Sequence, residues 1–498
     1  MFTSVNVKPE SETTMNAPSK AHGQELTAAE LKATLESLKQ AYRINPFPEW
    51  NQRKAWLMAL SDMVYENKLR IAEAISADFG YRSQNDTLLA EVFPSLEGIR
   101  HAIKHGKGWM KPRNEGASIW FKPASTCLMP QPLGVVGVIV PWNYPLFLSI
   151  GPMIAALTAG NRVFIKMSEY TPRFSALLDE LLSKALGRDV VQVINGGPEV
   201  AAEFSRLPFD HLLFTGSTPV GKMVMKAASE NLVPVTLELG GKSPVIITAP
   251  TVANPGRFEN AIARTLSGKS INAGQTCIAP DYLMVPEGCE EQLISHARAI
   301  IDRRFPDGIL SKDFTGIVSD RHATRLQRLI DEATEQGARV VTLMKTADSP
   351  GRKIPMTLVF NAKPDSMLMQ EEIFGPVLPV VTYKRLDEAL DYINDRPRPL
   401  ALYLFDDESK TQDMVMKQTI AGGVCLNETL FHIAQENLPF GGVGDSGMGH
   451  YHGKFGFDTM TKLKPIFKQS RFHVMEMLSP PYDNKMFAFM TKLLTRKV

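Results

Sequence analysis

The stretch NAGQTC, from Asn272 to Cys277, presents one cysteine beside residues that favour an exposed turn. Gly274 supplies backbone freedom and Gln275 is polar, which is typical of a loop that offers a nucleophile. Most free cysteines, however, are inert side chains that pack as small hydrophobes. From these residues alone, a core filler and a nucleophile remain equally open. A working cysteine also needs an oxyanion donor, a base and an acceptor for electrons.

Two polar side chains follow apolar runs that are typical of buried strands. Asn143 lies in PWNYP, after GVVGVIV, and its amide N–H can stabilise a developing oxyanion. A turn asparagine that satisfies its own backbone is the alternative. Glu238 lies in LELGGK, between two leucines and before a double glycine. Because burial raises the pKa of a carboxyl group, Glu238 is a candidate general base near neutral pH rather than an ordinary surface glutamate.

A second group of motifs suits a nucleotide. The segment FTGSTPVG joins a predicted strand to a helix and places Gly216, Ser217 and Gly221 where free amides can hold a pyrophosphate. It is not a GxGxxG sequence, so an ordinary strand–turn–helix explains it equally well. Lys166 ends an earlier candidate strand, RVFIK, and Glu169 comes three residues later, so both suit ribose hydroxyls at the carboxyl end of that strand. A lysine at a strand end is more often a solvated charge.

Two further segments add to the candidate site. EEIFGP supplies another carboxylate, Glu372, with an aromatic ring, Phe374, close behind it. The run NLPFGGVGDSGMG is dense in glycine, which lets the backbone approach a ligand or another segment closely. Both lie between apolar segments, so we expect them to be loops at the edge of a sheet.

The composition is that of an ordinary globular protein, with 44% hydrophobic and 22% charged residues. A formal charge of +2 gives no reason to invoke nucleic acid. The four cysteines form no CxxC pair, which argues against disulfides and against a metal site. No apolar run approaches the roughly 20 residues that span a bilayer, and the polar N-terminus lacks the apolar core of a secretory signal. We therefore expect a reduced, cytoplasmic protein.

The 498-residue chain is too long for one core. Helical spacing up to residue 113 gives way, after residue 133, to short Val/Ile/Leu strands that alternate with helices. This predicts an α/β fold with a Rossmann-like parallel sheet covered on both faces, followed by a second α/β unit. The predicted parts are a disordered lead-in (1–24), a nucleotide-binding domain (25–113 and 133–240), a catalytic domain (241–445), a β-hairpin arm with its C-terminal strands (114–132 and 446–475) and a tail (476–498).

Taken in order, PWNYP, IKMSE, FTGST, LELGGK, NAGQTC, EEIFGPV and LPFGGVGDSGMG resemble the aldehyde dehydrogenase superfamily. NAGQTCIAPDY and PFGGVGDSGMGHYHGKFGFDT are most similar to its class-3 branch, and within it to bacterial coniferyl aldehyde dehydrogenase-like members. The resemblance covers residues 25–475. It implies oxidation of an aldehyde to the carboxylic acid with NAD, NADP being accepted as well. It also implies a homodimer in which the arm serves oligomerisation.

Carried over by motif, the resemblance implies a role for each candidate. Cys277 attacks the aldehyde carbon to form a thiohemiacetal, whose oxyanion is held by Asn143 and the Cys277 N–H. Hydride transfer leaves a thioester, which is hydrolysed by water that Glu238 activates. The cofactor contacts are Glu372 and Lys166 on the two riboses, Ser217 on the pyrophosphate and Phe374 near the nicotinamide. Since the thiolate is the reactive form, we expect nearby dipoles to lower the pKa of Cys277.

Two alternatives remain. A CoA-acylating or phosphorylating relative would cleave the thioester with another nucleophile, but the presence of Glu238 argues against it. A catalytically inactive nucleotide-binding scaffold would have no need of Cys277, Asn143 and Glu238 together. The sequence departs from the class-3 pattern at Met167, where relatives often have proline, and in a longer loop between Glu238 and Cys277.

Aromatic residues near the motifs indicate the substrate class. Trp142 and Tyr144 flank the candidate oxyanion donor, while Leu430 and Phe431 precede the glycine-rich run. They favour aryl aldehydes such as coniferaldehyde, or medium-chain aliphatic ones. His432 is more simply a structural histidine. The apolar C-terminal segment MFAFMTKLLTRKV is too short to span a membrane, and we expect it to cover a neighbouring subunit rather than a membrane surface.

The charge of Glu169 yields a prediction about cofactor choice. A carboxylate there repels a 2′-phosphate and competes for the ribose hydroxyls, which favours NAD over NADP. The substitution Glu169→Gln should therefore raise kcat/KM for NADP relative to NAD. An unchanged ratio of the two kcat/KM values would contradict this assignment.

Overall fold

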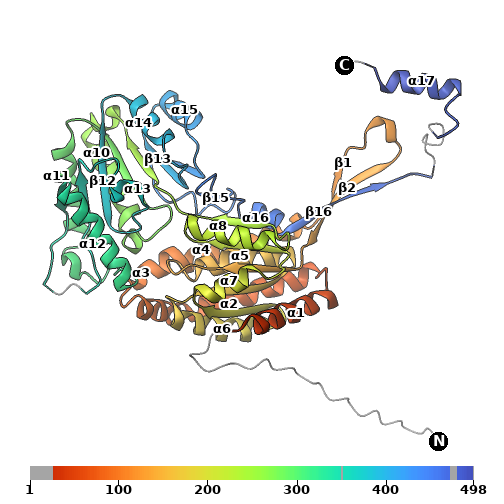
Figure 1. Cartoon of the computed structure of the whole chain (residues 1–498), viewed down its shortest axis with the longest axis horizontal. Helices are drawn as coiled ribbons and strands as arrows, with labels where there is room; N and C mark the ends of the chain where they lie inside the picture. The colour runs from red at the N-terminus through yellow and green to blue at the C-terminus, as the bar shows by residue number, and fades with distance from the viewer. Residues whose placement is uncertain (1–25, 349–350, 472–478, 497–498) are drawn as a thin grey trace, which may run out of the picture.

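A computed structural model describes residues 26–348, 351–471 and 479–496. Within these residues the chain builds two α/β units and a three-stranded arm that extends away from the first unit (Figure 1). The predicted α/β fold class with parallel sheets is confirmed. The predicted lead-in lies outside the described residues, as do parts of the predicted tail.

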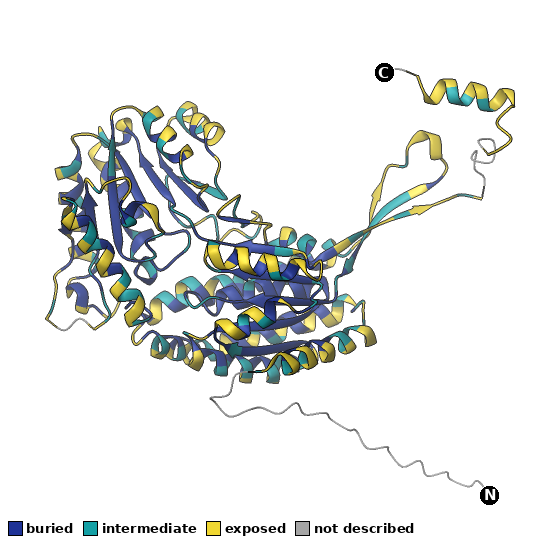
Figure 2. Ribbon diagram, in the orientation of Figure 1, coloured by how far each residue is buried: buried dark blue, intermediate teal, exposed yellow. Residues whose placement is uncertain are grey.

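The first unit is built on a six-stranded sheet in the order β15-β7-β6-β3-β4-β5, parallel except for β15. Its strands are β3 (Val135–Ile139), β4 (Arg162–Ser168), β5 (Val191–Gly196), β6 (His211–Thr215), β7 (Val235–Glu238) and β15 (Gly447–Met448). Every residue of β3, β4 and β6 is buried, as expected for strands covered on both faces (Figure 2).

Helices cover both faces of this sheet. They are α1 (Ala28–Ile44), α2 (Trp50–Asp78), α3 (Gln84–Thr87), the π-helical turn η1 (Leu88–Val92), α4 (Phe93–Trp109), α5 (Phe147–Ala159), α6 (Pro172–Leu186), α7 (Pro198–Ser205), α8 (Thr218–Ser229) and α16 (Gly453–Thr459). Val136 and Val138 of β3 pack with the α2, α4, α5 and α6 side, whereas Val135 and Ile139 pack with α1, α7 and α8. The strand therefore contributes alternate residues to two cores.

The second unit contains a seven-stranded sheet in the order β10-β11-β12-β9-β8-β13-β14, parallel except for β10. Its strands are β8 (Pro244–Ile247), β9 (Tyr282–Pro286), β10 (Arg339–Thr342), β11 (Thr357–Phe360), β12 (Val377–Tyr383), β13 (Ala401–Phe405) and β14 (Gly423–Leu426). Its helices are α9 (Ala249–Val252), α10 (Pro255–Ser270), η3 (Ile271–Gly274), α11 (Glu290–Arg304), η4 (Gly308–Leu310), α12 (Asp320–Glu335), α13 (Met367–Gln370), α14 (Leu386–Asn394) and α15 (Ser409–Gln418). The sequence did not predict β11, because a short apolar run such as TLVF cannot be distinguished from a buried helix segment by periodicity.

The arm is an antiparallel sheet in the order β1-β2-β16. The predicted hairpin supplies β1 (Arg113–Glu115) and β2 (Ser125–Pro132), with the turn η2 (Ile119–Phe121) between them, and β16 (Thr461–Lys468) comes from the far end of the chain. Beyond the arm, helix α17 (Lys485–Leu494) contains no buried residue. Among the described residues, none of the helices combines the length and the apolar character needed to cross a membrane.

The side chain of Asn161 ties the arm to the first unit. It is fully buried, and its Oδ1 accepts the N–H groups of Leu133 (2.7 Å) and Gly134 (3.0 Å), where β2 leads into β3. Its Nδ2 donates to the carbonyl of Met460 (2.9 Å), directly before β16. One amide thus satisfies backbone groups of two distant segments.

We expect Asn161→Ala to destabilise this junction, because it leaves buried backbone donors and an acceptor without partners. The free energy of unfolding should fall by about 2–4 kcal/mol, measured by guanidinium denaturation. Asn231→Ala is the matched control, since the exposed Asn231 amide reaches only the carbonyl of Arg206, and its effect should stay within about 0.5 kcal/mol. Equal losses in the two variants would contradict the role given to Asn161.

Candidate active site

A cleft of about 660 Å³ is lined by residues of both α/β units. Most of the residues that the sequence singled out meet there: Asn143, Gly216, Ser217, Glu238, Cys277, Glu372 and Phe374. The carboxyl ends of β3, β6 and β7 supply the residues from the first unit, and loops supply those from the second. Parallel strands bring their carboxyl ends to one edge of a sheet, which explains why segments so distant in sequence converge.

Three predicted cofactor contacts do not line this cleft. Lys166 is buried near the end of β4, with its Nζ 3.7 Å from the Glu169 carboxylate. Gly221 lies inside α8, where a Cβ would come within 2.6 Å of Leu239 Cδ2. This glycine therefore allows α8 to pack closely against the chain that follows β7. Contacts of Lys166, Glu169 and Gly221 with a nucleotide stay predictions.

The loop that carries Cys277 has an unusual backbone. Asn272, Ala273 and Gly274 are all left-handed, with φ of 51°, 51° and 71°. A Cβ on Gly274 would lie 2.4 Å from the carbonyl oxygen of Gly375, so only glycine permits this contact. The loop is therefore pressed against the segment that carries Glu372 and Phe374.

Gln275 holds this backbone in place, although its importance was not recognised from the sequence. Its Nε2 donates to the carbonyls of Asn272 (2.9 Å) and Gly316 (3.0 Å). Its Oε1 accepts the N–H of Val318 at 3.0 Å. Since non-glycine residues in the left-handed region cost about 1–3 kcal/mol each, such a fully bonded side chain is what keeps the loop in one conformation.

Asn143 is buried directly beside the cysteine loop. Its Nδ2 donates to the carbonyl of Gln275 at 3.2 Å, and the Oη of its neighbour Tyr144 lies 2.6 Å from Thr276 Oγ1. An amide carries two N–H groups, so one remains for the oxygen of a ligand. The turn after β3 and the cysteine loop are thus joined by side chains on either side of the candidate oxyanion site.

Glu238, the last residue of β7, is buried at the cleft, and neither of its carboxylate oxygens has a hydrogen-bond partner among the described residues. Burial raises the pKa of Glu238 well above its ordinary value. An unpartnered carboxyl group in a cleft is available to a ligand or to water, and a raised pKa is what a general base near neutral pH requires.

The thiol of Cys277 is half-buried in the same cleft. Burial, followed by the carboxyl groups of Glu372 and Glu238, raises its pKa, whereas the N–H groups of Cys277 and Ile278 act in the opposite direction. The expectation that dipoles would lower this pKa is therefore wrong for the chain by itself. The loss of hydration and two nearby carboxyl groups outweigh the amides, so the resting group is the thiol.

The carboxyl group of Glu372 is placed to accept hydrogen bonds from a ligand with several hydroxyl groups. Its Oε1 has no hydrogen-bond partner in the part of the chain that the structure describes, and a Cβ on Gly240 would overlap its Oε2 at 2.0 Å, so the carboxylate lies directly on the double glycine. Burial and Asp281 raise the pKa of Glu372 to about 8, and the Gly241 N–H lowers it. Ser217, at the N-terminus of α8, is exposed and makes no side-chain cap. These free groups fit a dinucleotide, with ribose hydroxyls on Glu372 and phosphate at the helix end.

Lys269 is a buried cation that the sequence did not reveal. It lies in the last turn of α10, before the cysteine loop, and its Nζ is fully buried without a hydrogen-bond partner in the described chain. Burial lowers the pKa of Lys269 to about 8, with Asp281 opposing the shift. A lysine at the end of an amphipathic helix normally looks like a surface charge, so no sequence signal distinguishes it.

The aromatic residues expected near the substrate have different surroundings. The Trp142 ring meets Phe374 edge-on at 5.4 Å in the cleft, whereas Phe431 is 62% exposed. His432 is half-buried with its Nδ1 3.1 Å from Cys425 Sγ, and the loss of hydration lowers the pKa of His432 to about 4. These contacts favour a structural role for His432.

Within the described parts of the chain, no group of three or more His, Cys, Asp or Glu residues could hold a metal ion.

Comparisons with known proteins agree on one family. The family model described as "Aldehyde dehydrogenase family" matches residues 7–466. A protein of Pseudomonas aeruginosa named "Probable coniferyl aldehyde dehydrogenase" is 50% identical over 467 residues, which cover 94% of this chain and 97% of the relative.

Two solved structures extend this likeness to the fold. The substrate-bound state of Staphylococcus aureus AldH has a TM-score of 0.86 and 37% identity, covering 93% of this chain and 99% of that one. The NAD+ complex of a Bacillus cereus aldehyde dehydrogenase has a TM-score of 0.79 and 26% identity, with 90% of each chain covered.

The raised pKa of Glu372 predicts that NAD binds more weakly in acid. The predicted hydrogen bonds from ribose hydroxyls require the ionised carboxylate, which is the minor form below pH 8 because the pKa of Glu372 is about 8. The Kd for NAD, measured by fluorescence titration, should rise roughly tenfold from pH 9 to pH 7. Glu372→Gln should weaken binding and flatten this dependence, while Glu371→Gln, which alters the exposed neighbour, should retain it. The same slope in Glu372→Gln would show that another group titrates.

Proposed function

The chain belongs to the aldehyde dehydrogenase family, and on this basis we propose that it oxidises aryl aldehydes of the coniferaldehyde type to their acids through a thioester on Cys277. Oxidation of an aldehyde with NAD or NADP is the activity of the family. The name of the P. aeruginosa relative supports the aryl substrate, and medium-chain aliphatic aldehydes are the second candidate class. The observation that carries the mechanism is the convergence of Cys277, Asn143 and Glu238 on one cleft.

The first half of the reaction forms the bond to sulfur. Cys277 adds to the aldehyde carbon, and the Asn143 amide with the Cys277 N–H stabilises the oxyanion of the thiohemiacetal. The free N–H of Asn143 supports this role, since the other one is held by Gln275. NAD, when bound, accepts the hydride that leaves this carbon. Burial, with Glu372 and Glu238 nearby, disfavours the thiolate, so the thiol gives its proton to solvent water in the cleft as the sulfur attacks the aldehyde carbon.

The second half releases the acid. Glu238 takes a proton from water, which attacks the thioester and frees the Cys277 sulfur. Its unpartnered, buried carboxyl group with a raised pKa supports this role. A CoA-acylating or phosphorylating enzyme would not need this base, and an inactive nucleotide-binding scaffold would need none of the three groups.

We assign the cofactor contacts in the same way. Ser217 and the amides at the start of α8 hold the pyrophosphate, Glu372 accepts ribose hydroxyls, and Phe374 lies towards the nicotinamide end. Glu169 favours NAD over NADP. Each of the first three residues lines the cleft, which supports the assignment, whereas that of Glu169 depends on its charge alone.

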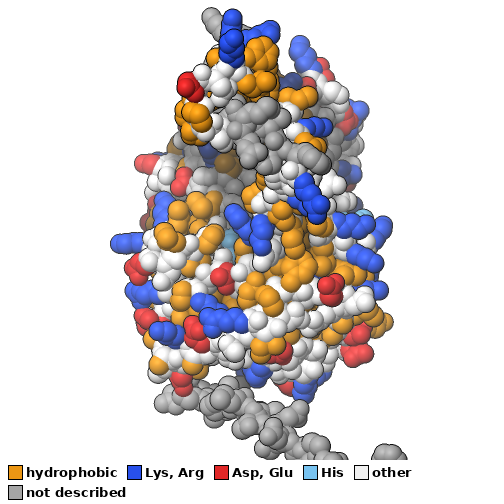
Figure 3. All heavy atoms as spheres, turned by 90° about the vertical axis from the view of Figure 1, so that its right-hand side faces the viewer, with side chains coloured by type: hydrophobic (Ala, Val, Ile, Leu, Met, Phe, Trp, Pro, Cys, Tyr) orange, Lys and Arg blue, Asp and Glu red, His pale blue; other side chains and the backbone are white. Residues whose placement is uncertain are grey.

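We also propose a cytoplasmic homodimer in which the arm joins the subunits. The arm exposes large apolar side chains, and Figure 3 shows hydrophobic groups among the charges on the face that carries it. These side chains are Ile119, Trp120, Phe121 and Phe467. Apolar surface on a projecting arm is best explained if a second copy covers it.

The thioester route predicts different kinetic behaviour for two variants. The wild type should release NADH in a burst of one equivalent per site, followed by steady turnover. Glu238→Gln should keep the burst but lose about 10²–10⁴-fold of the steady rate, because hydrolysis lacks its base. Cys277→Ala should show neither phase. Repeating the assay with CoA or phosphate tests the alternative acceptors, and undiminished turnover in Glu238→Gln would exclude Glu238 as the base.

The dimer predicts a mass of two 55.2 kDa chains in size-exclusion chromatography with light scattering. A charge on the arm, Trp120→Asp, should shift the protein towards monomer, whereas Leu310→Asp, at a more exposed leucine of the second unit, should not. A monomeric wild type at all concentrations would refute the dimer.

A further inference from the structure

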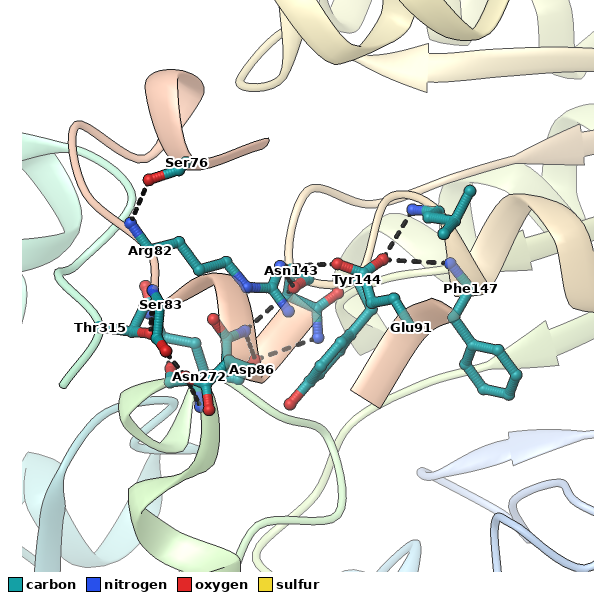
Figure 4. A network of polar contacts seen from close by, with 12 residues as sticks. Ser76, Arg82, Ser83, Asp86, Glu91, Asn143, Tyr144, Phe147, Asn272 and Thr315 are labelled. Atoms are coloured by element: carbon teal, nitrogen blue, oxygen red, sulfur yellow. Dashed lines mark hydrogen bonds and ion pairs between the residues drawn. The ribbon is translucent and has the colours of Figure 1, made fainter. Parts of the chain in front are cut away.

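The most deeply buried ion pair of the described chain lies behind the candidate oxyanion site (Figure 4). The side chains of Arg82 and Glu91 are both 0% exposed, with Arg82 Nη1 2.8 Å from Glu91 Oε1. Neither residue lines the cleft. Because burying two charges costs several kcal/mol each before they attract one another, such a pair calls for a specific role rather than general stabilisation.

Arg82 and Glu91 form hydrogen bonds with opposite ends of the turn that carries Asn143. Arg82 Nη1 donates to the backbone carbonyl of Asn143 at 3.0 Å. Glu91 Oε2 accepts the N–H groups of Leu146 (2.7 Å) and Phe147 (3.1 Å), which are free because α5 begins there. The carboxylate thus caps α5 while the guanidinium fixes the carbonyl of the residue whose amide faces the ligand.

The same short segment also reaches the cysteine loop. Asp86 Oδ2 accepts the N–H of Asn272 at 3.1 Å and the Thr315 hydroxyl at 2.6 Å. Asn272 Nδ2 in turn donates to the Asn143 carbonyl at 3.0 Å, so this oxygen receives hydrogen bonds from both Arg82 and Asn272. Residues 82–91 therefore contact both the turn that carries the candidate oxyanion donor and the loop that carries the nucleophile.

The planar shape of the Arg82 guanidinium group contributes to its position, as does its charge. The Arg82 guanidinium carbon lies 5.1 Å from the ring centres of both Phe79 and Tyr144. Its Nε and Nη2 have no hydrogen-bond partner in the described residues, so flat packing between rings holds the group in plane. A lysine keeps the charge but cannot stack or direct two N–H groups in this way.

We propose that Arg82 and Glu91 are positioning residues, which set the place of the Asn143 amide relative to Cys277. This inference rests on the proposed function, because it takes Asn143 as the oxyanion donor. Neither Arg82 nor Glu91 lines the cleft, so the pair acts on the reaction only through the turn that carries Asn143. Its effect should appear in kcat, where the oxyanion forms, and not in the affinity for NAD.

The test is a double-mutant cycle of Arg82→Lys with Asn143→Ala, measured as kcat/KM for an aryl aldehyde. Asn143→Ala should cost about 10²–10³-fold. Arg82→Lys should cost about 10–100-fold, mainly in kcat, with an unchanged Kd for NAD. The double variant should be no slower than Asn143→Ala alone, because Arg82 has nothing left to position. If Arg82→Lys does not fold, the neutral pair Arg82→Met with Glu91→Gln takes its place in the cycle.

Arg53→Lys is the matched control. Arg53 is equally buried and donates to the carbonyls of Thr158 and Ala159 at the other end of α5, far from the cleft residues in sequence and contacts. It should lower the melting temperature but leave kcat/KM intact. Full activity in the Arg82 variant, or the same loss in the Asn143→Ala background, would overturn the positioning role alone. Full activity in Asn143→Ala would overturn it together with the proposed oxyanion site.

Discussion

Two reciprocal hydrogen bonds join the halves of the candidate site. Asn143 Nδ2 donates to the carbonyl of Gln275, and Asn272 Nδ2 donates to the carbonyl of Asn143. These bonds connect the turn after β3 in one α/β unit to the loop of Cys277 in the other. The distance between nucleophile and oxyanion donor therefore depends on how the two units meet, and every buried group behind the turn acts on that distance.

Burial governs the electrostatics of the cleft. It raises the pKa values of Cys277, Glu238 and Glu372 and lowers that of Lys269. All four shifts favour the uncharged form, since a charge loses hydration there and few hydrogen bonds replace it. The unpartnered carboxyl group of Glu238 in the cleft can respond to a ligand, because binding supplies hydrogen-bond partners that the described chain does not.

Much of the architecture could be predicted from local patterns. Apolar runs such as GVVGVIV and HLLFT predict buried parallel strands, and the carboxyl ends of β3, β6 and β7 place Asn143, Ser217 and Glu238 at one edge of the sheet. Two features could not be predicted: β11 is an apolar run that shows no strand periodicity, and the left-handed backbone at Ala273 has no sequence signature. Contacts with distant segments hold that backbone, since Gln275 of the same loop is bonded to Gly316 and Val318, and Gly375 packs against Gly274.

The sequence by itself determined the kinds of groups available to the reaction and their order along the chain. Residue types and turn motifs are local properties, so Cys277, Glu238 and Asn143 could be singled out beforehand. Only the tertiary structure decided their environment. It buried Arg82, Glu91 and Lys269, whose sequence context is that of surface charges, and it raised the pKa of the thiol that dipoles were expected to acidify. Burial and charge proximity depend on which distant segments pack together, and no local pattern encodes that.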